Sequence, residues 1–131
     1  MNAVKKKRIL LADDEELVRN TLRRALEEDG HEVVEVVGGA DVLRTDCSKI
    51  DLIVMDVVMP EGDGIEAMTE LRKTMPNLPV IAMSGVGRAG SYLKIMDALG
   101  ATTMLKPFSG KELLVTVNEC LSGKPRNLDP S

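Results

Sequence analysis

The amino-acid sequence predicts one α/β domain in which five parallel strands alternate with five helices. Short apolar runs bounded by turn-forming residues alternate with longer segments in which apolar residues recur at helical spacing. The central segment, residues 51–56, contains four consecutive apolar residues, 52–55, and ends on Asp56, which is typical of a parallel strand buried on both faces. A length of 131 residues suits a single hydrophobic core.

The first half of the chain supplies three of the expected strands and two of the helices. In order, we expect a strand (8–12), a helix (15–29), a strand (32–37), a short helix (40–47) and the central strand (51–56). Leu17, Val18 and Leu22 begin the predicted inner face of the first helix, and Gly30 ends that helix. Leu43 and Cys47 mark the inner face of the second helix.

The second half repeats the same alternation. We expect a helix (64–74), a strand (79–83), a helix (92–99), a strand (102–105) and a last helix that ends at residue 121. Ser109 and Glu112 form a predicted capping box at the start of the last helix. We expect the domain to cover residues 1–121, with 122–131 as a polar tail or the stub of a linker.

Polar residues stand where the strands end. Asp13 and Asp14 follow the first strand, Asp56 ends the third, Ser84 follows the fourth and Lys106 follows the fifth. In a doubly wound, flavodoxin-like sheet of strand order 2-1-3-4-5, these ends share one edge, where such folds bind ligands. Two carboxylates about 4 Å apart repel by roughly 4 kcal/mol at an effective dielectric of 20. A divalent cation such as Mg²⁺ relieves that repulsion, and the hydroxyl and ammonium groups suit a phosphoryl oxygen.

Composition excludes several other classes. A net charge of −4 gives no electrostatic signal for direct nucleic-acid binding. No apolar run is long enough to span a membrane, and no signal peptide is apparent, so we expect a cytoplasmic protein. Cys47 and Cys120 lie far apart and suggest neither a zinc site nor a disulfide framework.

The ordered set of motifs resembles the receiver (response regulator) domain of two-component signal transduction over residues 7–121. The matching features are the acidic pair Asp13-Asp14, the Asp-x-x-Met-Pro motif that begins at Asp56, Ser84 after the fourth strand, and Lys106-Pro107-Phe108. Each motif alone is common, but their order and spacing together are specific.

The resemblance implies a role for each of these residues. Asp56 would accept a phosphoryl group, Ser84 would bond to it and Lys106 would pair with it. Asp14, Asp56 and the backbone carbonyl of Val58 would bind Mg²⁺ directly, with Asp13 acting partly through water. The Lys106-Pro107 bond would be cis. Ser84 would also act as a switch residue, as would the residue at position 103, which is commonly aromatic in relatives but is Thr103 here.

The resemblance also implies partners. A sensor histidine kinase or phosphotransfer protein would donate the phosphoryl group. A downstream protein, or a C-terminal output domain if the chain is truncated, would respond through the fourth helix, fifth strand and fifth helix. The protein would then be a signalling phosphoacceptor that catalyses its own phosphoryl transfer and slow autodephosphorylation, rather than an enzyme.

Two other functions remain as alternatives. A phosphatase-like hydrolase would use Asp56 as nucleophile, but it would need a second Asp two residues later, where Val58 stands. A receiver-like module that binds partners without phosphorylation would not require these five polar residues together. Individually, Asp13 and Asp14 could be acids at a helix N-terminus, Ser84 a turn residue and Lys106 a surface charge.

Overall fold

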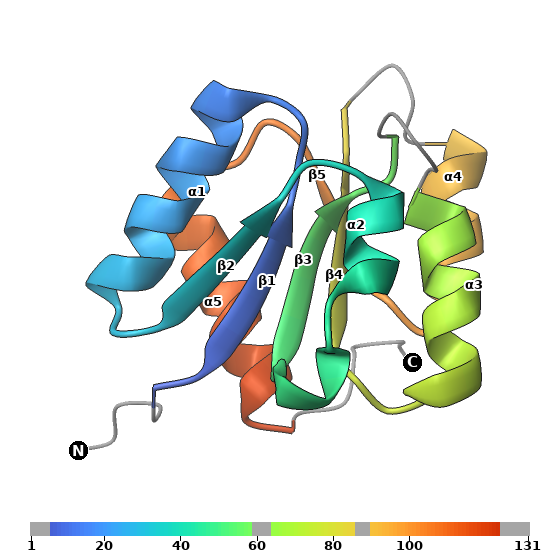
Figure 1. The fold of residues 1–131 in the computed structure, drawn as a ribbon. Coiled ribbons are helices and arrows are strands. Elements are labelled where there is room, and N and C mark those ends of the chain that lie inside the picture. The colour runs from blue at the N-terminus through green and yellow to red at the C-terminus, as the bar shows by residue number, and fades with distance from the viewer. Residues whose placement is uncertain (1–5, 59–63, 86–89, 124–131) are drawn as a thin grey trace.

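The computed structural model describes residues 6–58, 64–85 and 90–123, and it confirms the predicted parallel sheet. Its strands are β1 (Arg8–Ala12), β2 (Glu32–Val36), β3 (Leu52–Asp56), β4 (Val80–Ser84) and β5 (Thr102–Leu105). They pair in the order β2-β1-β3-β4-β5, as predicted (Figure 1). The Met59-Pro60 part of the predicted motif and most of the tail from residue 122 lie outside the described residues.

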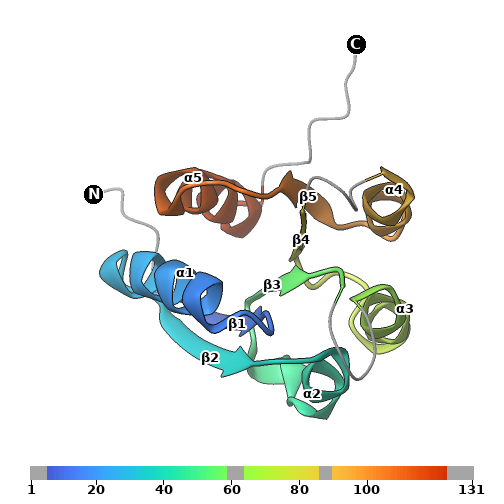
Figure 2. The same ribbon diagram turned by 90° about the horizontal axis from the view of Figure 1, so that it is seen from above.

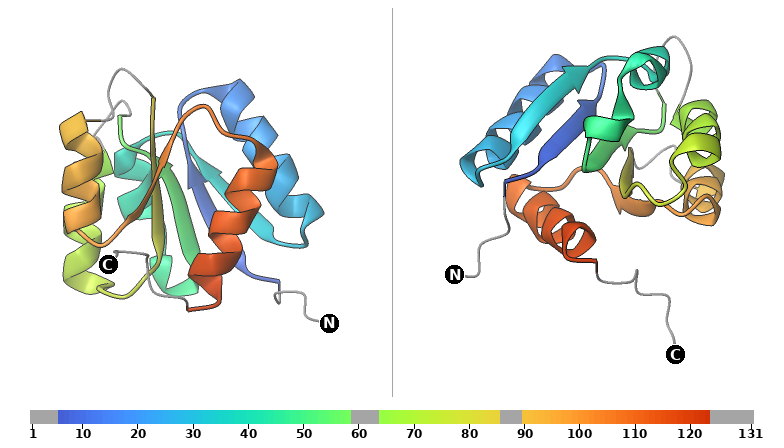
Figure 3. Two further views of the ribbon diagram at one scale, coloured as in Figure 1. Left: turned by 180° about the vertical axis from the view of Figure 1, so that it is seen from behind. Right: turned by 60° about the horizontal axis from the view of Figure 1, so that its bottom comes forward.

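Helices cover both faces of the sheet. They are α1 (Glu16–Glu28), α2 (Gly39–Arg44), α3 (Gly64–Thr74), α4 (Gly90–Ala98) and α5 (Gly110–Leu121), with a short 3₁₀ turn, η1 (Cys47–Lys49), before β3. Viewed from above, α1 and α5 lie on one face and α2, α3 and α4 on the other (Figure 2). The view from behind shows α5 beside α1 (Figure 3). This is the doubly wound arrangement expected from right-handed crossovers.

Alternate residues of each central strand enter two separate cores. Leu10, Ile53 and Ala82 belong to the core under α2, α3 and α4. Their chain neighbours Leu11, Val54 and Ile81 belong to the core under α1 and α5. Because every residue of β3 and β4 is buried, these strands read as continuous apolar runs, and a polar residue at their ends is conspicuous in the sequence.

Two predicted inner positions are wrong. Leu17 is 81% exposed and Leu43 is 43% exposed, whereas Val42 beside it is fully buried. The second helix also ends at Arg44, so Cys47 lies in the 3₁₀ turn η1 and not on a helix face. In a helix of six residues the apolar spacing does not determine which side faces the sheet, because the alternative faces contain equally apolar residues.

Candidate functional site

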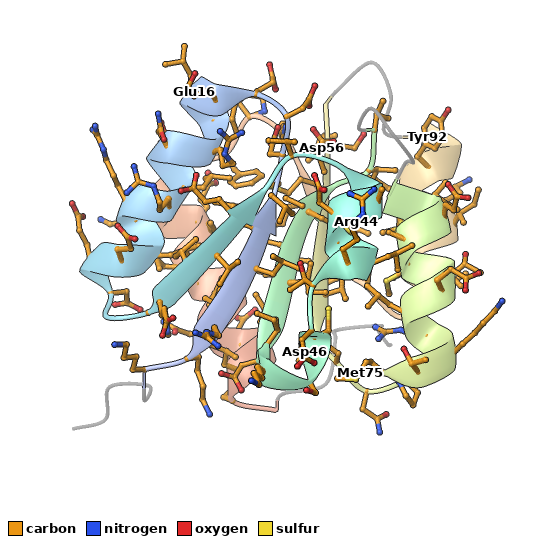
Figure 4. All side chains as sticks on the ribbon, in the orientation of Figure 1. Glu16, Arg44, Asp46, Asp56, Met75 and Tyr92 are labelled. Atoms are coloured by element: carbon orange, nitrogen blue, oxygen red, sulfur yellow. The ribbon has the colours of Figure 1, made fainter. Side chains whose placement is uncertain are left out.

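Asp56 is the last residue of β3 and lies at the carboxyl edge of the sheet (Figure 4). It is 8% exposed, and its Oδ1 atom accepts a hydrogen bond of 3.2 Å from the backbone N–H of Val58. Gly64, the first residue of α3, donates its N–H to the carbonyl of Val57. A Cβ atom on Gly64 would lie 2.8 Å from the carbonyl oxygen of Asp56, so only glycine fits against this strand end.

Asp13 extends from β1, the strand beside β3, and is fully buried. Its Oδ1 atom accepts a hydrogen bond of 2.9 Å from the N–H of Glu15. Its backbone carbonyl accepts a bond of 2.8 Å from the Arg19 guanidinium on the first turns of α1. The side chain and the backbone carbonyl of Asp13 are thereby fixed to the start of α1.

Lys106 follows β5 and joins the two buried carboxylates. Its Nζ atom lies 2.9 Å from an oxygen of Asp13 and 2.9 Å from an oxygen of Asp56. Its backbone N–H donates to the carbonyl of Ser84 at 2.7 Å, and the Lys106-Pro107 peptide bond is cis. The predicted capping box of Ser109 and Glu112 is present and begins α5 directly after this segment. Asp56 lies 50 positions before Lys106 in the chain and Asp13 lies 93 positions before it, and the fold brings all three into one ion-pair network.

Burial and the ion-pair network together shift the pKa of Asp56 and of Lys106. Burial raises the pKa of the Asp56 carboxyl, because a carboxylate loses water there, and the hydrogen bond and charge of Lys106 oppose this rise. Burial would lower the pKa of Lys106, but its hydrogen bonds to Asp56 and Asp13 outweigh burial and raise it. Lys106 is thus a permanent cation that offsets the cost of burying Asp56.

A cavity of about 370 Å³ opens beside these groups. It is lined by Asp14, Glu15, Asp56, Val58, Ser84, Gly85 and Lys106. All of these come from the ends of β1, β3, β4 and β5, so the structure brings four predicted strand ends together. Thr103 does not line this cavity; it lies on β5 and lines a separate groove with Leu105 and Val115.

Three carboxylates stand close enough to share a cation. Ligand oxygens of Asp13, Glu15 and Asp56 all lie within 4.8 Å of one another. Carboxylate oxygens are the ligands that hard divalent cations prefer, and one ammonium leaves this group with net negative charge. Asp14 is exposed and lines the adjoining cavity, but its carboxylate is not one of the three. Sequence reasoning missed Glu15, although the run of four acids from Asp13 to Glu16 was a visible signal.

The family of the chain follows from a comparison with known domains. Residues 9–118 match the model of the response regulator receiver domain. The chain belongs to that family. The phosphatase-like alternative is not favoured, and the receiver domain described here has the flavodoxin-like, CheY-like fold of its relatives.

Individual relatives agree with this assignment. An uncharacterized transcriptional regulatory protein, YbdJ of Bacillus subtilis, is 33% identical over 114 residues, which are 87% of this chain and 50% of that protein. The sensor kinase CckA of Brucella abortus is 37% identical over 116 residues, 86% of this chain and 12% of that protein. The receiver domain of the Francisella response regulator 1452 is 28% identical, with a TM-score of 0.79, over 90% of this chain and 98% of that structure.

The chain therefore spans half or less of the length of these curated relatives, whereas it covers nearly all of the Francisella receiver-domain structure. Within the described ranges, no helix combines the length and the apolar character needed to cross a lipid bilayer.

Proposed function

We propose that this receiver domain takes a phosphoryl group onto Asp56 from a phosphorylated histidine of a sensor kinase or phosphotransfer protein. The observation that carries the proposal is the position of the Lys106 ammonium, 2.9 Å from both Asp13 and Asp56 beside a cavity that also contains Ser84. A carboxylate held beside a fixed cation at an open strand end is suited to displacement at an anionic phosphorus.

The transfer is a direct displacement. An oxygen of Asp56 forms a bond to phosphorus while the bond from phosphorus to the histidine nitrogen breaks, and its electron pair stays on the imidazole. The product is an aspartyl phosphate. Lys106 would pair with its new negative charge, and the Ser84 hydroxyl would donate to a phosphoryl oxygen.

Mg²⁺ is the proposed cofactor, and the oxygen ligands of the site fit it. Asp14, Asp56 and the backbone carbonyl of Val58 would hold the ion, with Asp13 acting in part through water. Asp14, Asp56 and Val58 all line the cavity, and the oxygens of Asp13 and Asp56 belong to the group within 4.8 Å. When bound, the ion would offset the repulsion between the carboxylate and the incoming phosphoryl group.

Phosphorylation would change partner binding at the face formed by α4, β5 and α5. Side chains that are apolar and exposed gather on these elements: Tyr92, Ile95, Leu105 and Val115. Ser84 and Thr103 are the proposed switch residues that connect the phosphoryl group to this face. The partner would be a downstream protein or an output domain of a longer chain, without direct contact of this domain with nucleic acid or membrane, and the reaction would take place in the cytoplasm.

The phosphorylated state should be long-lived. Val58 lines the cavity, and its side chain offers no hydrogen-bond acceptor that could orient an attacking water. The domain would therefore act as a phosphoacceptor with slow autodephosphorylation, not as an enzyme that turns over a separate substrate.

Phosphorylation by acetyl phosphate and Mg²⁺, followed by intact-protein mass spectrometry, tests the proposal. The wild type should gain one phosphoryl group and Asp56→Asn should gain none. Asp51→Asn is the matched control, because Asp51 precedes the same strand at its opposite end and is exposed. A full yield of adduct on the Asp56→Asn variant would refute the assignment.

A further inference from the structure

Glu15 occupies the N-cap position of α1 without acting as a cap. The usual N-cap residues are Ser, Thr, Asp and Asn, whose short side chains bond to the first free N–H groups of the helix. In the described structure, the Glu15 side chain makes no such bond. Its own N–H is instead held by Asp13 Oδ1 at 2.9 Å. The Glu15 carboxylate extends to Lys106, with its Oε1 atom 3.5 Å from Nζ.

The three carboxylates around Lys106 differ in exposure. The side chain of Asp13 is 0% exposed and that of Asp56 is 12% exposed, whereas that of Glu15 is 63% exposed. Lys106 therefore has two buried partners on the inside and one solvated partner at the rim of the cavity. If the Lys106 ammonium moves toward Glu15, the ammonium becomes solvated and still has a carboxylate partner.

Lys106 contacts two of the carboxylates that are proposed to act on a divalent cation. Its Nζ atom lies between the oxygens of Asp13 and Asp56, two members of the carboxylate group that could hold a metal. A cation held by these carboxylates would repel the ammonium, so binding of Mg²⁺ would favour withdrawal of the ammonium from at least one buried carboxylate. This argument rests on the function proposed above.

We propose that Glu15 is a positioning residue that receives the Lys106 ammonium when a divalent cation binds. By offering a partner outside the metal site, Glu15 lowers the cost of displacing Lys106, and so it raises the affinity for Mg²⁺ without contacting the ion. It also keeps Lys106 near the cavity, where the ammonium is needed once Asp56 carries a phosphoryl group.

A double-mutant cycle on the full chain tests this role. Mg²⁺ affinity is measured by isothermal titration calorimetry for the wild type, Glu15→Gln, Lys106→Met and the double variant, after circular dichroism has shown that each is folded. If Lys106→Met fails to fold, Lys106→Gln replaces it. Glu16→Gln is the matched control, because Glu16 is the next acid on the chain and is exposed (Figure 4).

Glu15→Gln should weaken Mg²⁺ binding by about two- to fivefold, the size expected for a partly exposed ion pair. The same change in the Lys106→Met background should have at least a twofold smaller effect, and Glu16→Gln should have none. Equal losses in both backgrounds would overturn the proposal, because Glu15 would then act on the metal directly. The absence of any loss would overturn it as well.

The outcome separates this inference from the proposed function. A wild type that binds no Mg²⁺ and takes no phosphoryl group would refute both. A wild type that binds Mg²⁺ and is phosphorylated on Asp56, but whose cycle is additive, would refute only the role of Glu15.

Discussion

Asp56 must be buried to meet Asp13 and Lys106, and must be ionised to attack phosphorus. Its burial raises the pKa of the carboxyl, so the folded protein binds this proton more tightly than the unfolded chain does. The free energy of unfolding should therefore fall as the pH rises through the interval between the unfolded and folded pKa values of Asp56.

This linkage predicts the effect of Asp56→Asn on stability. Above that interval the buried charge of Asp56 lowers the free energy of unfolding of the wild type. The Asp56→Asn variant has no such charge, and its Lys106 keeps the contact with Asp13. The variant should be more stable than the wild type at pH 7, and the difference should shrink as the pH falls through that interval toward about 3.9, the usual pKa of an Asp. Urea unfolding at a series of pH values measures it. A variant less stable than the wild type at pH 7 would contradict the argument.

Val58 gives a second prediction at the scale of one residue. Val58→Asn adds an amide to the cavity that can orient water toward the phosphoryl group, so the lifetime of the aspartyl phosphate should shorten several-fold. Decay of the phosphorylated protein after removal of acetyl phosphate measures this. Val37→Asn, an exposed position beyond β2, serves as the control. Identical decay rates for the wild type and Val58→Asn would show that this side chain does not control water.

The site residues that could be predicted from the sequence are those that stand at the end of a predicted strand. Asp56 and Lys106 each end an apolar run, so their position in the sheet follows from the pattern alone. Glu15 could not be found in this way, because four consecutive acids look alike in the sequence. Which of them reaches Lys106 depends on where α1 begins and on the direction of its first turn.

At the scale of elements, the junction of β3 with α3 depends on Gly64. Gly64→Ala would bring a Cβ atom to within 2.8 Å of the Asp56 carbonyl and 2.9 Å of the Val57 Cα atom, so β3 or α3 must shift. We expect a loss of about 1–3 kcal/mol in stability, as for other overpacked sites, together with slower phosphorylation by acetyl phosphate.

Gly110→Ala is the matched control for this junction. Its Cβ atom would lie 2.8 Å from the Cβ atom of Ala25, so it crowds the contact between α5 and α1, away from Asp56. Urea unfolding should show a loss of stability for both variants, whereas the phosphorylation rate should fall only for Gly64→Ala. Equal rates for the two variants would mean that the junction does not position Asp56.

Element types and order were predictable because buried parallel strands and amphipathic helices have different apolar periods. The faces of the helices were less predictable. Leu17 lies in the first turn of α1, where it lines a groove with Pro107 and Phe108 instead of entering the core under the helix. An apolar residue near a helix end satisfies the helical pattern whether or not the sheet extends beneath it.

At the scale of the whole molecule, Mg²⁺ should act as a stabilising ligand, because its proposed ligands come together only in the folded state. At a concentration 100-fold above Kd, the free energy of unfolding should rise by about 2.7 kcal/mol. Thermal unfolding with and without Mg²⁺ measures the shift. Asp56→Asn should reduce the shift, and an equal shift in that variant would mean that the ion binds elsewhere.

The ion pair between Asp13 and Lys106 also affects when, during synthesis of the chain, the proposed phosphorylation site is complete. The two residues are separated by 93 positions, so the ion pair cannot form until the segment after β5 has been synthesised, long after β1 has left the ribosome. A chain that stops before β5 has the phosphoacceptor and its neighbouring acids but lacks the ammonium that neutralises them. Such a fragment presents unbalanced negative charge to an incoming phosphoryl group. On the proposed function, we therefore expect such a fragment to take up a phosphoryl group more slowly than the whole domain does.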